Sequence, residues 1–104
     1  MERPYIAIDQ KDVPWRRSTS ADGVWVKDLG SSDGRSIQLV RYEPGTTFPW
    51  HRHTGPEFVY VIEGEAIQRG KRLGPGWVGI APAETEEDDF ASETGCIFLT
   101  VYSE

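Results

Sequence analysis

The sequence lacks features that several classes of protein require. It has one cysteine, Cys96, among 104 residues, so neither an internal disulfide framework nor a cysteine-rich zinc site can form. No apolar run approaches the roughly 18 residues of a membrane helix, and no basic-then-apolar leader opens the chain. We therefore expect a soluble, cytoplasmic protein with no membrane partner, in which Cys96 is a small buried hydrophobe.

Positive charge is also scarce. Eleven Lys and Arg residues stand against seventeen Asp and Glu residues, which gives a net charge of -6 and opposes binding to nucleic acid. The excess lies in a single ten-residue segment that contains Glu84, Glu86, Glu87, Asp88, Asp89 and Glu93. Taken alone, this acidic segment predicts a solvated loop.

Helical periodicity is missing as well, because apolar residues nowhere recur with a spacing of three and four over eleven residues. Short β-rich runs alternate with turn signals instead, as the eleven Gly and seven Pro indicate. The expected strands are residues 24–29, 37–42, 48–53, 58–62, 65–69, 77–81 and 96–102. Residues 31–36 are expected to form a turn, and residues 70–76 a connection. This pattern predicts an all-β, single-domain antiparallel sandwich or barrel over residues 1–104.

Two of the expected strands are apolar on both faces: FVYVI at residues 58–62 and CIFLTVY at residues 96–102. A small antiparallel sheet usually leaves one face in water. We therefore expect the outer face to be covered either by an N-terminal arm, residues 1–22, or by a second copy of the chain. This reasoning predicts a homodimer.

The only two histidines, His51 and His53, are separated by one residue. On a strand, this spacing places both imidazoles on one face, where they can hold one metal ion at about 2.0–2.1 Å; two surface histidines on an edge strand would show the same spacing. Glu57 follows at the entrance to an apolar strand, where burying an unpaired carboxylate would be costly. A cation held by the three side chains would explain that position.

These residues also carry a resemblance to a known family. Five residues fit the pattern G-x5-H-x-H-x3-E-x6-G at every fixed position, namely Gly45, His51, His53, Glu57 and Gly64. The pattern resembles the first cupin motif. The resemblance implies an RmlC-like jelly-roll barrel with a divalent metal inside, held by His51, His53 and Glu57.

The segments that begin at Gly23, Arg41 and Ser92 look like those of ChrR-type cupins in particular. That group includes the cupin half of a zinc-binding anti-sigma factor and stand-alone dioxygenases that resemble the enzymes that cleave acetylacetone or dihydroxyacetophenone. The resemblance implies a metal-dependent enzyme that cleaves a small dicarbonyl or phenolic compound with oxygen. The alternatives are a non-catalytic metal- or ligand-binding sensory module and a barrel that has lost its metal. No catalytic nucleophile pattern can be drawn from the residues.

The second cupin motif, G-x5-P-x-G-x2-H-x3-N, is only partly present. Gly76 and Pro82 fit, but the motif's histidine falls on Glu87. Glu87 can serve as a fourth ligand beside two imidazoles and Glu57, a donor set suited to Fe2+, Mn2+ or Zn2+. A facial triad of both histidines and one glutamate, or lost metal affinity, are the other possibilities. Glu84 and Glu86 compete with Glu87, because a small slip of the loop would exchange them.

Overall fold

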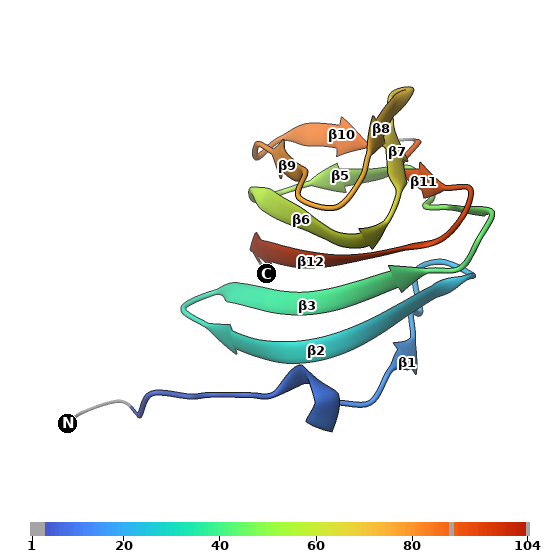
Figure 1. Cartoon of the computed structure of the whole chain (residues 1–104). Coiled ribbons are helices and arrows are strands. Elements are labelled where there is room, and N and C mark those ends of the chain that lie inside the picture. Colours follow the sequence, from blue (N-terminus) through green and yellow to red (C-terminus); the bar gives the residue numbers. More distant parts are fainter. Residues whose placement is uncertain (1–3, 88, 104) are drawn as a thin grey trace.

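The computed structural model describes residues 4–87 and 89–103, so residues 1–3, Asp88 and residue 104 lie outside the described part. It shows two facing layers of antiparallel strands (Figure 1). The larger sheet has the order β1-β2-β3-β12-β6-β9. Its strands are β1 (Arg16–Arg17), β2 (Val24–Ser32), β3 (Arg35–Tyr42), β12 (Cys96–Ser103), β6 (Glu57–Gly64) and β9 (Val78–Ala81).

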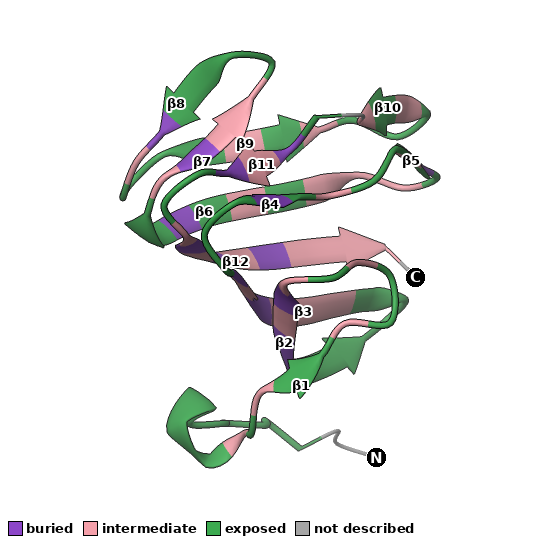
Figure 2. Cartoon of the chain, turned by 90° about the vertical axis from the view of Figure 1, so that its right-hand side faces the viewer, coloured by how far each residue is buried: buried purple, intermediate pink, exposed green. Residues whose placement is uncertain are grey.

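Two smaller sheets form the opposite layer, as Figure 2 shows from the side. One pairs β10 (Thr85–Glu87) with β5 (His51–His53), and the other has the order β4-β11-β7-β8. The strands of the second are β4 (Thr46–Thr47), β11 (Ala91–Ser92), β7 (Ala66–Gln68) and β8 (Lys71–Leu73). The expected all-β antiparallel fold is confirmed. A single 3-10 turn, η1 (Gln10–Asp12), is present among the described residues, and no helix there is long and apolar enough to span a membrane.

The hairpin between β2 and β3 corrects the expected turn at residues 31–36. Both strands continue further, and only Asp33 and Gly34 lie between them. Both have positive φ angles, 53° and 79°, as a tight two-residue hairpin turn with matching twist requires. Asp-Gly is among the preferred pairs for this turn, so the polar residues around it remain in the ladder.

The smaller sheets contain strands that the sequence pattern missed. Only residues 51–53 of the expected strand 48–53 form a strand, β5, while β4 precedes that range, and the expected connection 70–76 contains β8. The acidic segment contributes β10 and β11. Each of the missed strands is only two or three residues long, so hydrophobic alternation has too few positions in which to appear.

The core lies between the layers and is largely aromatic and β-branched. On β12, alternate residues point inward, and Cys96 and Phe98 are both buried. Phe98 packs edge-to-face against Tyr42 and Phe90, with ring centroids 5.4 and 5.5 Å apart, a favourable geometry for aromatic pairs. Cys96 is buried as expected, and burial raises the pKa of its thiol.

The N-terminal segment runs along β2, at the opposite end of the sheet from β6 and β9 (Figure 1). Lys27 on the outer face of β2 is buried beneath it. The Lys27 ammonium donates to the backbone oxygen and the side-chain oxygen of Gln10, at 3.0 and 2.9 Å, and lies 4.9 Å from the Trp15 ring centroid. This segment therefore covers one end of the outer face.

Gly64 provides a test of the close approach between β6 and β12. Its φ is +73°, and a Cβ there would collide with the carbonyl oxygen of Gly95 and lie 2.8 Å from the Cys96 Cα. We expect Gly64→Ala to lower the free energy of unfolding by about 3 kcal/mol or more, because backbone rather than a flexible side chain must move. Denaturant titration measures the loss.

Gly45→Ala is the matched control. Gly45 also has a positive φ, +81°, but a Cβ there meets no atom within 4 Å. We expect a cost of about 1–2 kcal/mol, which is that of a left-handed alanine alone. Equal losses in the two variants would show that the backbone contact at Gly64 contributes nothing.

Candidate metal centre

His51 and His53 lie on the inner face of β5, as their spacing predicts. His53 is 7% exposed, while His51 is partly exposed. Their rings meet edge-to-face with centroids 4.7 Å apart. Trp50 and Arg52, which alternate with them, are exposed. The strand therefore presents two neighbouring imidazoles to the interior.

Glu57 is the first residue of β6, as expected, and its carboxylate reaches the same place. Its Oε2 lies 2.9 Å from Nδ1 of His53, and its Oε1 accepts a hydrogen bond of 3.0 Å from the hydroxyl of Thr100. Thr100 is buried on β12, and it is not among the site residues expected from the sequence. The signal for it was the alternation of CIFLTVY, which puts Thr100 on the same face as Cys96 and Phe98.

Glu87 joins the cluster through the pairing of β10 with β5. In this register Glu87 lies opposite His51 and Glu86 lies opposite Arg52, so only Glu87 shares the inner face with the histidines. The Glu87 Oε2 lies 2.9 Å from Nε2 of His53 and 3.4 Å from Nε2 of His51. The structure thus brings Glu87 to the cluster rather than Glu84 or Glu86.

Glu84 and Glu86 pair instead with the guanidinium of Arg52 on the outer side of the strand. Glu84 hydrogen-bonds to Nη2, and Glu86 lies 3.9 Å from Nη1. Elsewhere in the acidic segment, Asp89 accepts from Gln68, and Glu93 lies 3.6 Å from Arg72. Apart from Glu87, most of the acidic side chains described in the segment therefore form hydrogen bonds or ion pairs with neighbouring side chains on the surface.

The two carboxylates of the cluster lie close together, and their basic partners among the described residues are the two histidines. Burial is the main cause that raises the pKa of Glu87, and the nearby charge of Glu57 raises it further, while the hydrogen bond with His53 opposes the shift. Across residues 4–87 and 89–103, the ion pairs of Glu57 and Glu87 are with histidine and none is with Lys or Arg. A divalent cation would offset this concentration of negative charge.

The donor atoms fit such a cation. One ligand atom from each of His51, His53, Glu57 and Glu87 can be chosen so that all four lie within 4.8 Å of one another. Nδ1 of His51 lies 3.1 Å from the carbonyl oxygen of Pro49. That contact requires Nδ1 to carry the proton and leaves the lone pair of Nε2 available to a cation. Nitrogen and carboxylate donors together suit Fe2+, Mn2+ or Zn2+.

The two glutamates approach His53 from different sides. Glu87 faces the Nε2 atoms of both histidines, whereas Glu57 faces Nδ1 of His53. With Nε2 as the ligating atom, Glu57 in this position would orient the His53 ring, and His51, His53 and Glu87 would form a triad. With Glu57 turned toward the cation, the site has four protein ligands. Both arrangements use Glu87.

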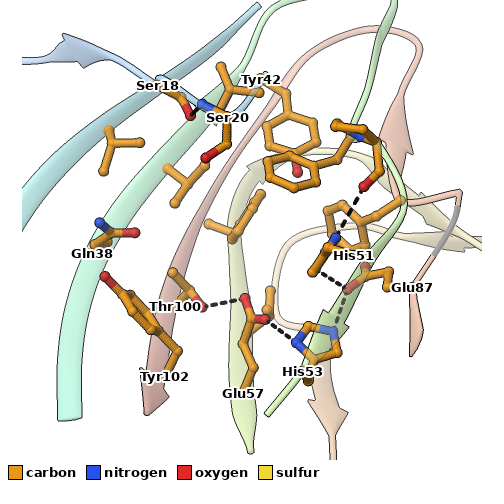
Figure 3. Close-up of a pocket in the computed structure, with 18 of the residues that line it drawn as sticks. Ser18, Ser20, Gln38, Tyr42, His51, His53, Glu57, Glu87, Thr100 and Tyr102 are labelled. Atoms are coloured by element: carbon orange, nitrogen blue, oxygen red, sulfur yellow. Dashed lines mark hydrogen bonds and ion pairs between the residues drawn. The ribbon is translucent and has the colours of Figure 1, made fainter. Parts of the chain in front are cut away.

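The cluster forms part of the wall of a cavity of about 610 Å3 (Figure 3). Aromatic and aliphatic side chains, among them Phe48, Phe98 and Val40, line much of it. Gln38 and Tyr102 lie on the side away from the histidines, and Ser18 and Ser20 lie along another edge. The cavity therefore has a wall with the four candidate metal ligands, an apolar middle and a polar far side.

Residues 4–104 match the model of a protein family described as the ChrR cupin-like domain. No curated protein matches the sequence significantly. Many solved structures do resemble it. A protein of Methylibium petroleiphilum, provisionally named an acetylacetone dioxygenase, has a TM-score of 0.89 and 18% identity over 99% of this chain and 79% of that one.

Two further solved structures are also similar to this chain. The acetylacetone dioxygenase of Acinetobacter johnsonii has a TM-score of 0.80 and 16% identity over 99% of this chain and 75% of that one. A chain from the complex of Rhodobacter sphaeroides SigE with the anti-sigma ChrR has a TM-score of 0.76 and 28% identity over 91% of this chain and 51% of that one. The similarity to the first of these shows the fold alone. This chain spans about half the length of the second.

Removing either imidazole should abolish stoichiometric cation binding. We expect His51→Ala and His53→Ala each to weaken the binding of Zn2+ or Mn2+ by about 100-fold or more, because each removes a nitrogen donor. Calorimetry on metal-depleted protein measures the affinity, and circular dichroism checks the fold. Arg52→Ala is the control, since Arg52 lies between the histidines but points outward to Glu84 and Glu86. If the histidine variants bind as tightly as the control, these side chains are not ligands.

Glu87 allows a test in both directions. Glu87→Ala should weaken cation binding, whereas Glu87→His should keep or tighten the binding of late first-row metals, because imidazole suits them better than carboxylate does. Titration of Co2+ or Ni2+, followed by visible absorption, compares the two variants with the wild type. An unchanged affinity in Glu87→Ala would remove Glu87 from the ligand set.

Proposed function

The chain belongs to the ChrR cupin-like family, and we propose that it is a metal-dependent enzyme that cleaves a small dicarbonyl or phenolic compound with oxygen. The observation that carries the proposal is the convergence of His51, His53, Glu57 and Glu87 at the wall of the cavity. The ligands would be these four residues, and the cofactor would be one Fe2+, Mn2+ or Zn2+ ion.

The donor set leaves room for a substrate at the cation. Three or four protein ligands leave coordination positions open on Fe2+ or Mn2+ when these ions take five or six ligands, as in non-haem oxygenases with two histidines and one carboxylate. When bound, the cation would act as a Lewis acid toward a carbonyl or phenolate oxygen. The rest of the cavity is formed by side chains that can hold an apolar molecule and keep water away from it.

The size and lining of the cavity favour a substrate larger than a five-carbon diketone. Cavities of several hundred Å3 typically enclose ligands of drug size, and about 610 Å3 is open here, its mouth included. Phe48, Phe90 and Phe98 line it, and their rings can pack against an aromatic group. We therefore propose an aryl-substituted dicarbonyl or a phenolic ketone, with its oxygen atoms toward the histidines.

The reaction balances without another oxidant or reductant. In the cleavage of a 1,3-dicarbonyl compound by O2, one bond between a carbonyl carbon and the central carbon breaks. One fragment leaves as a carboxylic acid and the other as a 1,2-dicarbonyl compound. Both atoms of O2 end in these products, so the chain needs no organic cofactor.

The alternative is a module that binds a metal or small ligand without turnover. It is supported by the 28% identity to a chain from the SigE–ChrR complex. The two functions share the cation and differ in whether oxygen is consumed. Measuring both properties on the same protein therefore separates them.

We expect oxygen uptake by protein loaded anaerobically with Fe2+ and then given a panel of acetylacetone, 1-phenyl-1,3-butanedione and 2,4′-dihydroxyacetophenone. The aryl compounds should have KM values about tenfold below that of acetylacetone, because they bury more apolar surface. Mass spectrometry with 18O2 should find label in both products. His53→Ala is the inactive control. Stoichiometric metal without oxygen uptake on any compound would favour the binding module instead.

A further inference from the structure

The outer face of the large sheet is covered at one end and bare at the other. Paired residues form one row across five strands, in the order Lys27, Leu39, Leu99, Tyr60 and Val78. The first two, beneath the N-terminal segment, are 7% and 8% exposed, whereas Tyr60 and Val78 are 49% and 57% exposed. Exposure therefore rises with distance from the arm.

The bare end is apolar and continuous. Phe58 pairs with Ile80 and Tyr60 pairs with Val78, so these side chains lie on one face, together with Ile62 at the next outward position of β6. All five are 43–66% exposed. We call Phe58, Tyr60, Ile62, Val78 and Ile80 the outer patch. Val59 and Val61, which alternate with them, point into the barrel.

We propose that a second copy of this chain covers the outer patch, in a symmetric dimer in which the two patches face each other. The exposed apolar area of the outer patch supports a second copy of the chain as the partner. Five such side chains, each about half exposed, present on the order of 500 Å2 of apolar surface. A standard interface buries about 800 Å2 per partner, of which about 60% is apolar, so one patch supplies the apolar part of one side.

The distribution of charge also supports a second copy of the chain as the partner. The chain carries a net charge of -6, which opposes association through most of its surface. The five side chains of the outer patch are uncharged. In a two-fold dimer each patch meets its own copy, so the five side chains bring no like charges together.

The arm limits how the two copies overlap. It occupies the layer above β2 and β3, which a partner sheet would otherwise fill. Two sheets can therefore stack only through their bare ends, with each arm beside the partner's β9 edge. In this arrangement the outer patch is buried, whereas the cavity that His51, His53, Glu57 and Glu87 line is on the inner side of the sheet.

Sedimentation equilibrium at micromolar concentrations tests the proposal. The wild type should have twice the mass of one chain, and Ile80→Glu and Tyr60→Glu should each raise the dimer dissociation constant by about 100-fold or more, because each charge enters the interface twice. Both residues are exposed in the single chain, so the variants should keep the wild-type circular dichroism spectrum.

Ser31→Glu is the matched control, since it places the same charge at an exposed position of β2 outside the outer patch. It should leave the dissociation constant within about twofold of the wild type. The proposal is overturned if the wild type sediments as a single chain throughout the micromolar range. It is also overturned if both patch variants keep the wild-type constant, or if Ser31→Glu weakens the dimer as much as they do.

Discussion

The candidate centre depends on the pairing of β5 with β10. This ladder is only three residues long, yet it decides which acid of the acidic segment faces the histidines. A shift of one residue would place Glu86 inside and Glu87 beside Arg52. The outward contacts of Glu84 and Glu86 with Arg52 and the inward contacts of Glu87 with both histidines favour the same register. Contacts on both faces of this short antiparallel pair thus determine which acid faces the histidines.

The local sequence was sufficient to predict the long strands and to recognise the family motif. β2, β3, β6 and β12 each have enough residues for alternation to show, and His51, His53 and Glu57 lie close together in the chain. The short strands of the opposite layer could not be predicted in the same way, because their apolar residues are few and their partners are distant. Glu87 was reached only through the resemblance, and Thr100 was missed, because its contact with Glu57 joins residues 43 positions apart in sequence.

At the candidate centre, burial disfavours the charged form of the two acidic side chains, and this points to a group that offsets their charge. Glu87 and Glu57 are partly buried and close to each other, which raises the pKa of Glu87. A carboxyl pair in such a position weakens the fold unless a cation or protons offset the charge. His53 meets this need in part, since its ring can donate a proton to one of the two acids. A divalent ion meets it more fully and uses the same nitrogen and oxygen atoms.

β6 connects the candidate centre to the outer patch. Glu57, Val59 and Val61 alternate inward, while Phe58, Tyr60 and Ile62 alternate outward. Glu57 must be held in place for its oxygens to meet both Thr100 and His53, and the strand that carries it is fixed on its inner side by the core and on its edges by β12 and β9. The outer side of β6 is exposed among the described residues of the single chain. A second copy on that side would complete the packing around β6 without changing any residue of the cavity, so association and cation binding can be altered separately by substitutions on opposite faces of one strand.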